Sequence, residues 1–217
     1  MITPKPYLSF SQMTLFEKSP DIYLQRYIYG EKQYVTKNMA YGSLLADGLK
    51  DEEATGDPLL DLMASKIPKF ELMDQPIEDP KGIEIFFERD NKNIKVPVLT
   101  DKKITIPLLA LPDTAKATYE AFKEYKTSVR KWTQKMADES GQITFYATAI
   151  WLAKGIIPSD IELDNLQVEY DEDGRLRPTE NILRFPTKRT MIDVIKMTRR
   201  IKVAWAGIKQ LVEKELL

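Results

Sequence analysis

Three charged residues are spaced so that they could hold a divalent metal ion beside a phosphate group. Pro112-Asp113 is followed, after ten intervening residues, by Glu124-Tyr125-Lys126, a pattern written PD-x(10)-ExK. Successive side chains of a β-strand point to opposite faces, so Glu124 and Lys126 should project together while Asp113 arrives from a neighbouring strand. Two carboxylates and the Tyr125 backbone carbonyl are hard oxygen ligands of the kind that Mg²⁺ or Mn²⁺ prefers. The pattern therefore predicts a metal site at these residues.

Such a site would support hydrolysis of a phosphate ester. A bound divalent ion lowers the pKa of its water ligand and offsets charge on the phosphate, so the chemistry needs no histidine. Lys126 would orient the attacking water or neutralise the developing oxyanion. Asp113, Glu124 and Lys126 are accordingly the predicted catalytic residues.

The composition of the 217-residue chain excludes several other kinds of chemistry. The chain contains no cysteine and no histidine, which rules out disulfides, iron–sulfur clusters, thiolate zinc sites and imidazole bases. An apolar content of 43%, with 10% aromatic residues, predicts a folded core rather than disorder. The net charge is −1, so any contact with nucleic acid must come from a local basic patch.

The elements that position these residues follow from hydrophobic spacing and capping signals. Residues 104–111 and 118–126 are predicted to form paired strands of a hairpin, which would bring Asp113 beside Glu124 and Lys126. Helices are expected within residues 8–30, where Pro20 divides two short helices, and over residues 39–53, 58–66, 140–155 and 189–217. Residues 70–73, 83–87, 94–99 and 160–170 are expected to be extended.

Beyond the PD-x(10)-ExK pattern, further segments resemble the PD-(D/E)XK nuclease superfamily, and in particular its RecB-like exonuclease branch. The segment 122–128 (FKEYKTS) resembles the DYKT strand of that branch, 142–146 (QITFY) its QxxxY helix, and 8–20 its N-terminal S-x-S segment. The resemblance implies an α/β fold of the restriction-endonuclease type, with a central mixed sheet flanked by helices. The resemblance touches residues 8–28, 39–50 and 104–155, a little under half of the chain. The domain that it implies is a single one over residues 1–217, with or without an insertion at 51–100.

The function that this resemblance implies is that of a Mg²⁺- or Mn²⁺-dependent deoxyribonuclease. An exonuclease in recombination, repair or phage DNA processing is expected, in the cytoplasm of a bacterial cell or an infected host. The expected partners are DNA and a recombination or single-strand-binding protein. No membrane segment is predicted, because the sequence has no sufficiently long apolar run. The alternative is a nuclease-fold module for DNA binding or assembly, with weakened or lost catalysis.

Two departures from the family bear on these expectations. Many relatives carry a histidine in a G-x-x-x-H helix, whereas this chain has Gly42-Ser-Leu-Leu-Ala-Asp47, so the resemblance places Asp47 at the metal-facing position. A carboxylate is a good ligand for a hard ion, and a solvated helix position is the alternative for Asp47. Iron–sulfur relatives have a cysteine where this chain has Ser19, and without any cysteine no cluster can form.

Predicted DNA contacts lie on one helix and in two basic stretches. Gln142 and Tyr146 are i, i+4 neighbours on a helix face, where they would hold a nucleotide or instead cap an edge of the core. Basic residues gather over 116–135 and 184–209, and acidic residues over 160–173. This distribution favours either a basic groove or the ordinary solvated face of a helix. The predicted phosphate contacts are Arg130, Lys131, Arg199 and Arg200.

Overall fold

The computed structural model describes residues 7–32, 34–51, 55–66, 77–78, 83–85 and 104–215. The helices are α1 (Phe10–Lys18), α2 (Pro20–Tyr23), the π-helix η1 (Leu24–Ile28), α3 (Lys37–Asp51), α4 (Pro58–Lys66), α5 (Gln134–Asp138), α6 (Gly141–Lys154) and α7 (Met191–Glu215). The strands are β1 (Leu8–Ser9), β2 (Ile77–Glu78), β3 (Ile83–Ile85), β4 (Ile104–Ile106), β5 (Leu108–Ala110), β6 (Thr114–Ala115), β7 (Ala121–Ser128), β8 (Asp160–Tyr170) and β9 (Leu176–Thr187).

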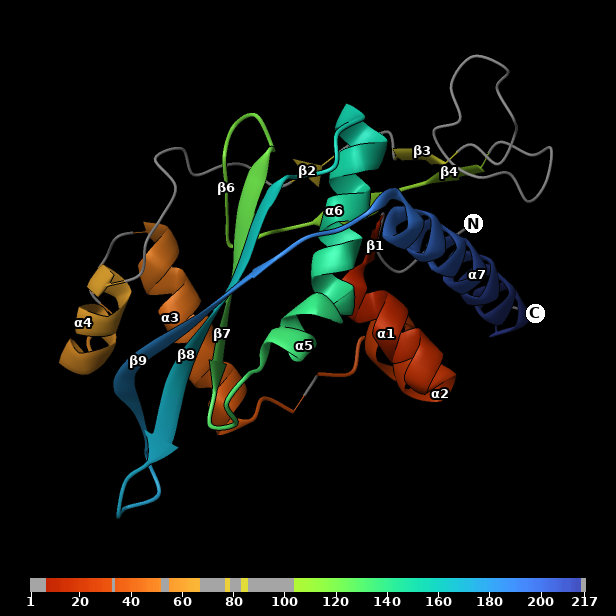
Figure 1. Cartoon of the computed structure of the whole chain (residues 1–217). Coiled ribbons are helices and arrows are strands. Elements are labelled where there is room, and N and C mark those ends of the chain that lie inside the picture. Colours follow the sequence, from red (N-terminus) through yellow and green to blue (C-terminus); the bar gives the residue numbers. More distant parts are fainter. Residues whose placement is uncertain are drawn as a thin grey trace.

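A four-stranded mixed sheet, in the order β6-β7-β8-β9, is the centre of an α/β arrangement. Strand β7 pairs antiparallel with β6 and parallel with β8, and β8 pairs antiparallel with β9. In Figure 1, α3 and α4 flank this sheet on one side, and α6 and α7 lie on the other. The predicted combination of a mixed sheet and flanking helices is therefore confirmed at this level.

The two faces of the sheet pack against different helices. On one face, the ring of Phe122 packs against Tyr146 of α6, with 6.1 Å between ring centroids. Because side chains alternate along a strand, Glu124 lies on this face, which we call the α6 face. On the other face, Tyr125 packs in a cluster with Leu60 of α4 and with neighbouring residues of α3 and β8. We call this second surface the α3 face.

The predicted hairpin is wrong in its first strand. Pro107 divides residues 104–111 into β4 and β5, which belong to different sheets, because proline has no N–H to donate to a strand ladder. Strand β5 pairs with β1 and β2, and β4 pairs with β3. The hairpin partner of β7 is instead the short strand β6, in the register Thr114 to Lys123. Asp113 directly precedes this strand, so it still arrives next to β7.

The helix boundaries follow local capping signals. The side chains of Ser9, Ser19 and Ser140 accept backbone N–H groups at the starts of α1, α2 and α6 respectively. Gly155 ends α6 with a φ of 76°, a left-handed conformation that glycine adopts without a steric clash. The predicted helices in these regions are confirmed.

Most of the other predicted elements are also confirmed. The helices expected at 39–53, 58–66 and 189–217 are α3, α4 and α7, and the strand expected at 160–170 is β8. Helix α5 and strand β9 have no predicted counterpart. Strand β3 confirms part of the extended segment at 83–87. The extended segments predicted at 70–73 and 94–99 lie outside the described residues, as does most of the possible insertion.

Helix α7 packs along the core and holds α1 in place. Its buried apolar residues include Val194, Ile201 and Ile208, which recur every seven residues and form one stripe. A Cβ atom added to Gly207 would lie 2.6 Å from the ring of Phe16, so glycine permits the close contact between α7 and α1. Within the described ranges, no helix has both the length and the apolarity needed to cross a bilayer.

Candidate active site and adjoining cavity

The structure brings Asp113, Glu124 and Lys126 together on the α6 face. Asp113 Oδ2 accepts a hydrogen bond from the backbone N–H of Tyr125 at 2.6 Å, which ties the end of the β5–β6 connection to the middle of β7. Lys126 Nζ forms an ion pair with Glu124 Oε1. The Asp113 and Glu124 carboxyls lie close enough that each shifts the pKa of the other. The two carboxyls and the lysine form one cluster, which we call the α6-face cluster.

Gln142 connects this cluster to helix α6. Its Nε2 donates hydrogen bonds to Glu124 Oε1 and to the Tyr146 hydroxyl, each at 2.7 Å, and its Oε1 accepts from Lys126 Nζ at 2.8 Å. An amide can donate to a carboxylate and accept from an ammonium at the same time, so Gln142 orients both charged groups. The predicted contacts of Gln142 and Tyr146 with a nucleotide stay a prediction.

Burial controls the ionisation of the two carboxyls. Glu124 is only 3% exposed, and its removal from water raises its pKa to about 8, a rise that Lys126 opposes and Asp113 increases. Asp113 is an exposed residue, yet protein atoms around its carboxyl displace water and raise its pKa, against the lowering effects of the Tyr125 N–H and Lys126. The pair therefore resists full ionisation unless a cation compensates it.

The donor atoms of this cluster fit a hard divalent cation. Glu124 Oε2 is buried and has no hydrogen-bond partner, although buried polar atoms usually have one. The N–H and C=O of a strand residue point toward the same neighbour, so the Tyr125 carbonyl faces the Asp113 side. Among the described side chains no group of three acidic residues forms a metal site, but Mg²⁺ commonly uses one or two carboxylates together with water and substrate phosphate.

Helix α3, which carries Asp47, contacts β7 from the α3 face. A Cβ atom on Gly42 would lie 2.9 Å from Thr127 Oγ1, so glycine allows the helix to approach the strand. The side chain of Asp47 lies outside the described residues. Its role as a metal ligand stays a prediction.

The four predicted phosphate contacts lie on two separate elements. Arg130 and Lys131 are exposed in the loop that follows β7, and Arg199 is exposed on α7. Arg200 forms a bidentate ion pair with Glu17, at 2.7 and 2.5 Å, so its charge is already compensated. Arg200 is therefore the least available of the four for a phosphate, and the contact of all four with DNA stays a prediction.

The α3 face carries a second charged cluster that the sequence analysis missed. Lys123 Nζ forms an ion pair with Glu162 and lies 3.9 Å from Asp164 Oδ2. Asp164 is fully buried, neither of its carboxylate oxygens has a hydrogen-bond partner, and burial raises its pKa to about 7. Glu162 and Asp164 alternate with Ile161 and Leu163 along β8. Because β8 is covered on both faces, Glu162 is half-buried and Asp164 is buried, as are the apolar residues between them. Their alternation with apolar residues was the signal in the sequence that could have indicated this cluster.

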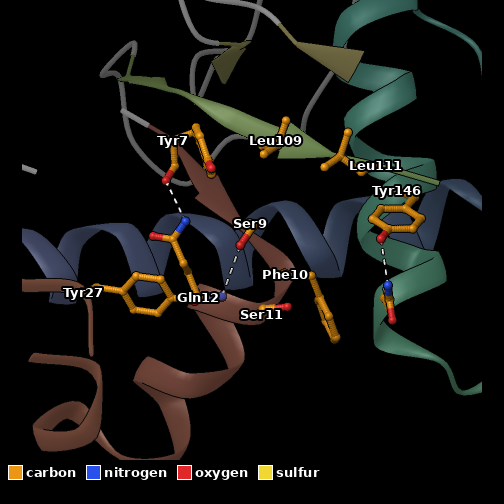
Figure 2. Close-up of a pocket in the computed structure, with 10 residues that line it drawn as sticks. Tyr7, Ser9, Phe10, Ser11, Gln12, Tyr27, Leu109, Leu111 and Tyr146 are labelled. Carbon is orange, nitrogen blue, oxygen red and sulfur yellow. Dashed lines mark hydrogen bonds between the residues drawn. The ribbon is translucent and has the colours of Figure 1, made fainter. Parts of the chain in front are cut away.

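A cavity of about 210 Å³ adjoins the α6-face cluster. Figure 2 shows its lining, which comes from β1, the start of α1, η1, the end of β5, and α6. Tyr146 and Gln142 belong both to this lining and to the hydrogen-bond network of the cluster. Ser9, the N-cap residue of α1, and Ser11 also line the cavity.

No protein-family model matches this sequence, and no curated protein matches it. The features of this chain that bear on its function are the α6-face cluster, the unpartnered oxygen of Glu124 and the adjoining cavity.

Proposed function

We propose that this protein is a metal-dependent DNA nuclease with a fold of the restriction-endonuclease type. The observation that carries the proposal is the buried, unpartnered Oε2 of Glu124 beside the carboxyl of Asp113. Lys126 pairs with Oε1 of Glu124 and is a single charge beside two carboxyls. A divalent cation would give Oε2 a partner and would supply the further positive charge that a buried pair of carboxylates needs. The PD-x(10)-ExK spacing of the same residues supports the superfamily assignment.

The ligands of the proposed metal ion are Asp113, Glu124 and the Tyr125 carbonyl, with Asp47 as a further predicted ligand. These are hard oxygen donors, which suit Mg²⁺ or Mn²⁺. When bound, such an ion polarises the scissile phosphate and lowers the pKa of a coordinated water.

The chain's own residues position the charges around the reacting phosphate. Lys126, partly exposed and held by Glu124 and Gln142, would donate to the attacking water or to an oxygen of the phosphate as negative charge develops. Gln142 limits the rotation of both of these neighbours, so we assign it a positioning role. Fixed orientation matters because a preorganised charge needs no rearrangement when the reaction occurs.

DNA is the proposed substrate, and exonucleolytic cleavage in recombination, repair or phage DNA processing is the proposed activity. The RecB-like segments support the exonuclease branch, and exposed Arg130 and Lys131 follow directly from the strand that carries Glu124 and Lys126. We place this activity in the cytoplasm, together with a recombination or single-strand-binding partner. The alternative of a catalytically weakened binding module is less well supported, because the cluster keeps both carboxyls and the lysine.

Incubation with labelled single-stranded and double-stranded DNA tests this function. The wild-type protein should cleave with Mg²⁺ or Mn²⁺ and should not cleave with a chelator. Glu124→Gln should be inactive, whereas Glu120→Gln, which changes an exposed residue just before β7, should cleave as the wild type does. Cleavage that survives chelation, or equal rates for wild type and Glu124→Gln, would refute the assignment. Metal-independent DNA binding without any cleavage would favour the binding module.

A further inference from the structure

The cavity beside the α6-face cluster is placed to hold part of a substrate. It has a volume of about 210 Å³, below the roughly 300 Å³ at which pockets for drug-sized ligands begin. Gln142 lines it and also donates to Glu124 Oε1 at 2.7 Å. A group bound in the cavity would therefore lie one amide side chain away from the carboxyls of the cluster.

The lining of the cavity suits a neutral aromatic ring. None of the ten described lining residues carries a charge, so the cavity lacks the arginine or lysine that usually recognises a phosphate. The aromatic members of the lining are Tyr7, Phe10, Tyr27 and Tyr146. Aromatic side chains bind unpaired nucleobases by stacking, and they do so with little dependence on sequence because every base has a π-face.

Gln12 provides a hydrogen-bond acceptor in this lining. The residue is 2% exposed, and its Nε2 donates to the Tyr7 carbonyl at 3.0 Å. Because only the nitrogen of an amide can donate, this bond fixes which end of the side chain is the oxygen. Within the described part of the chain, Gln12 Oε1 accepts no hydrogen bond. An N–H group of a ligand would satisfy it.

Tyr146 provides a hydrogen-bond donor. Its hydroxyl oxygen accepts from Gln142 at 2.7 Å, which leaves the hydroxyl proton available for another acceptor. Burial is the largest cause of a raised pKa at Tyr146, so the hydroxyl stays protonated at neutral pH. An acceptor and a donor beside aromatic rings match the edge and the faces of a nucleobase.

We propose that this cavity receives one unpaired nucleobase of the DNA strand, next to the phosphate at the α6-face cluster. The proposal rests on the nuclease function above and specifies its substrate class as a strand whose base is unpaired at the cleavage position. A paired base cannot enter, because its hydrogen-bonding edge faces the partner strand and its faces are stacked on neighbouring bases.

Abasic substrates test the proposal directly. Single-stranded oligonucleotides of one length, each with a single abasic residue at a different position, would be bound to the inactive variant Glu124→Gln, with fluorescence anisotropy as the readout. Removal of the base that occupies the cavity should weaken binding by about 10-fold, and removal of other bases should have smaller effects. Wild-type cleavage rates with the same substrates provide a second readout.

Variants of the cavity should reproduce this effect in the protein. Tyr27→Ala should weaken binding of the intact strand by about 10-fold and should become insensitive to the critical abasic position, whereas Tyr27→Phe should keep most of the affinity. Ser11→Trp changes an exposed residue of the lining and should block the cavity without removing a core side chain. Tyr34→Ala is the matched control, since Tyr34 is 85% exposed and is not among the residues that line this cavity.

The outcomes separate the two proposals. Cleavage with no abasic effect at any position, or an equal abasic penalty in wild type and in Ser11→Trp, would overturn the cavity proposal and leave the nuclease intact. Base-dependent binding without metal-dependent cleavage would overturn the nuclease and leave the cavity proposal intact. A preference for fully paired duplex over single strands would also overturn the cavity proposal.

Discussion

The two faces of the central sheet carry similar charged groups in different surroundings. Each face holds two carboxyls and one lysine: Asp113, Glu124 and Lys126 on the α6 face, and Glu162, Asp164 and Lys123 on the α3 face. On the α6 face, the side chain of Lys126 is 28% exposed and a neutral amide bridges the charges. On the α3 face, the side chain of Lys123 is 11% exposed and Asp164 is fully buried.

This difference shows that charge composition alone does not define a candidate active site. Burial removes the hydration of an ion cluster, and only well-placed partners offset the free energy that is lost. On the α3 face that partner is mainly Lys123. The α6-face cluster has Gln142 as an orienting partner and a cavity beside it. Under the proposed function, access and orientation favour the α6 face for chemistry, and the burial of the α3-face cluster predicts a structural role for it.

The largest expected difference between the faces is in cleavage rate. Asp113→Asn should reduce the rate by about 1,000-fold or more, because it removes charge from a site with few other ligands. Asp164→Asn makes the same chemical change on the α3 face and should keep the rate within about threefold of wild type, since most changes away from a site act on stability alone. Single-turnover assays at matched folded concentrations would measure both. Similar losses in the two variants would remove the functional distinction between the faces.

The two lysines should separate activity from stability. Lys126→Met should lower the cleavage rate by about 100-fold, the scale of one lost electrostatic stabiliser. Because the Lys126 side chain is 28% exposed, against 11% for Lys123, the fall in melting temperature should be smaller than for Lys123→Met. Lys123→Met removes the nearest counter-charge of Glu162 and Asp164 and leaves the weaker effect of Arg184 on Asp164. Removal of one partner from a buried pair costs about 3 kcal/mol. For a protein of this size, that cost lowers the melting temperature by about 6 °C or more. Calorimetry and parallel rate assays would measure both effects. A larger fall in melting temperature for Lys126→Met, or a larger loss of rate for Lys123→Met, would contradict the comparison of the two faces.

Metal binding should stabilise the fold through one face only. Mn²⁺ at about 100 times its Kd should stabilise the wild type by about 2.7 kcal/mol, since it binds the folded state selectively. Glu124→Gln should lose most of this gain, whereas Glu162→Gln should retain it. Differential scanning fluorimetry with a metal titration would measure the shifts. An undiminished shift in Glu124→Gln would place the metal elsewhere.

The buried acid of the α3 face should make stability depend on pH. Burial, aided by Glu162, raises the pKa of Asp164 to about 7 in the folded state, while an unfolded aspartate ionises near pH 4. Between these values the folded state binds the additional proton, so the free energy of unfolding falls as pH rises from about 4 to 7. Asp164→Asn should flatten this fall. Melting temperatures at pH 5 and pH 8 would test it, and equal pH dependence in both proteins would contradict the burial argument.

The smallest expected effect concerns the exposed basic residues. Neutralisation of Arg130 or Lys131 should reduce the slope of log affinity against log salt by about one unit if each contacts a phosphate. Arg200→Gln should change the slope less, because Glu17 already compensates its charge. Anisotropy titrations with DNA at several salt concentrations would give the slopes. Unchanged slopes in the first two variants would assign them to the solvated surface.

Helix boundaries were predictable because their signals are local. Ser140 and Gly155 mark the ends of α6 through interactions within one turn of the chain. The partner of β7 was not predictable in the same way, because strand pairing joins residues that are distant in sequence. Pro107 signalled an interruption, but only the register of Thr114 with Lys123 showed which strand replaced the expected one.

The sequence by itself limited the available chemistry: without cysteine or histidine, it leaves carboxylates, lysine, hydroxyls and backbone groups, and the PD-x(10)-ExK spacing selects two carboxylates and a lysine among them. Strand alternation also placed Glu124 and Lys126 on a common face. Only the tertiary structure decided that Gln142 bridges them, that Glu124 Oε2 lacks a partner and that Gln12 lines a cavity beside them. The physical reason is that desolvation and hydrogen-bond satisfaction depend on neighbours from other elements, and no local sequence pattern specifies those neighbours.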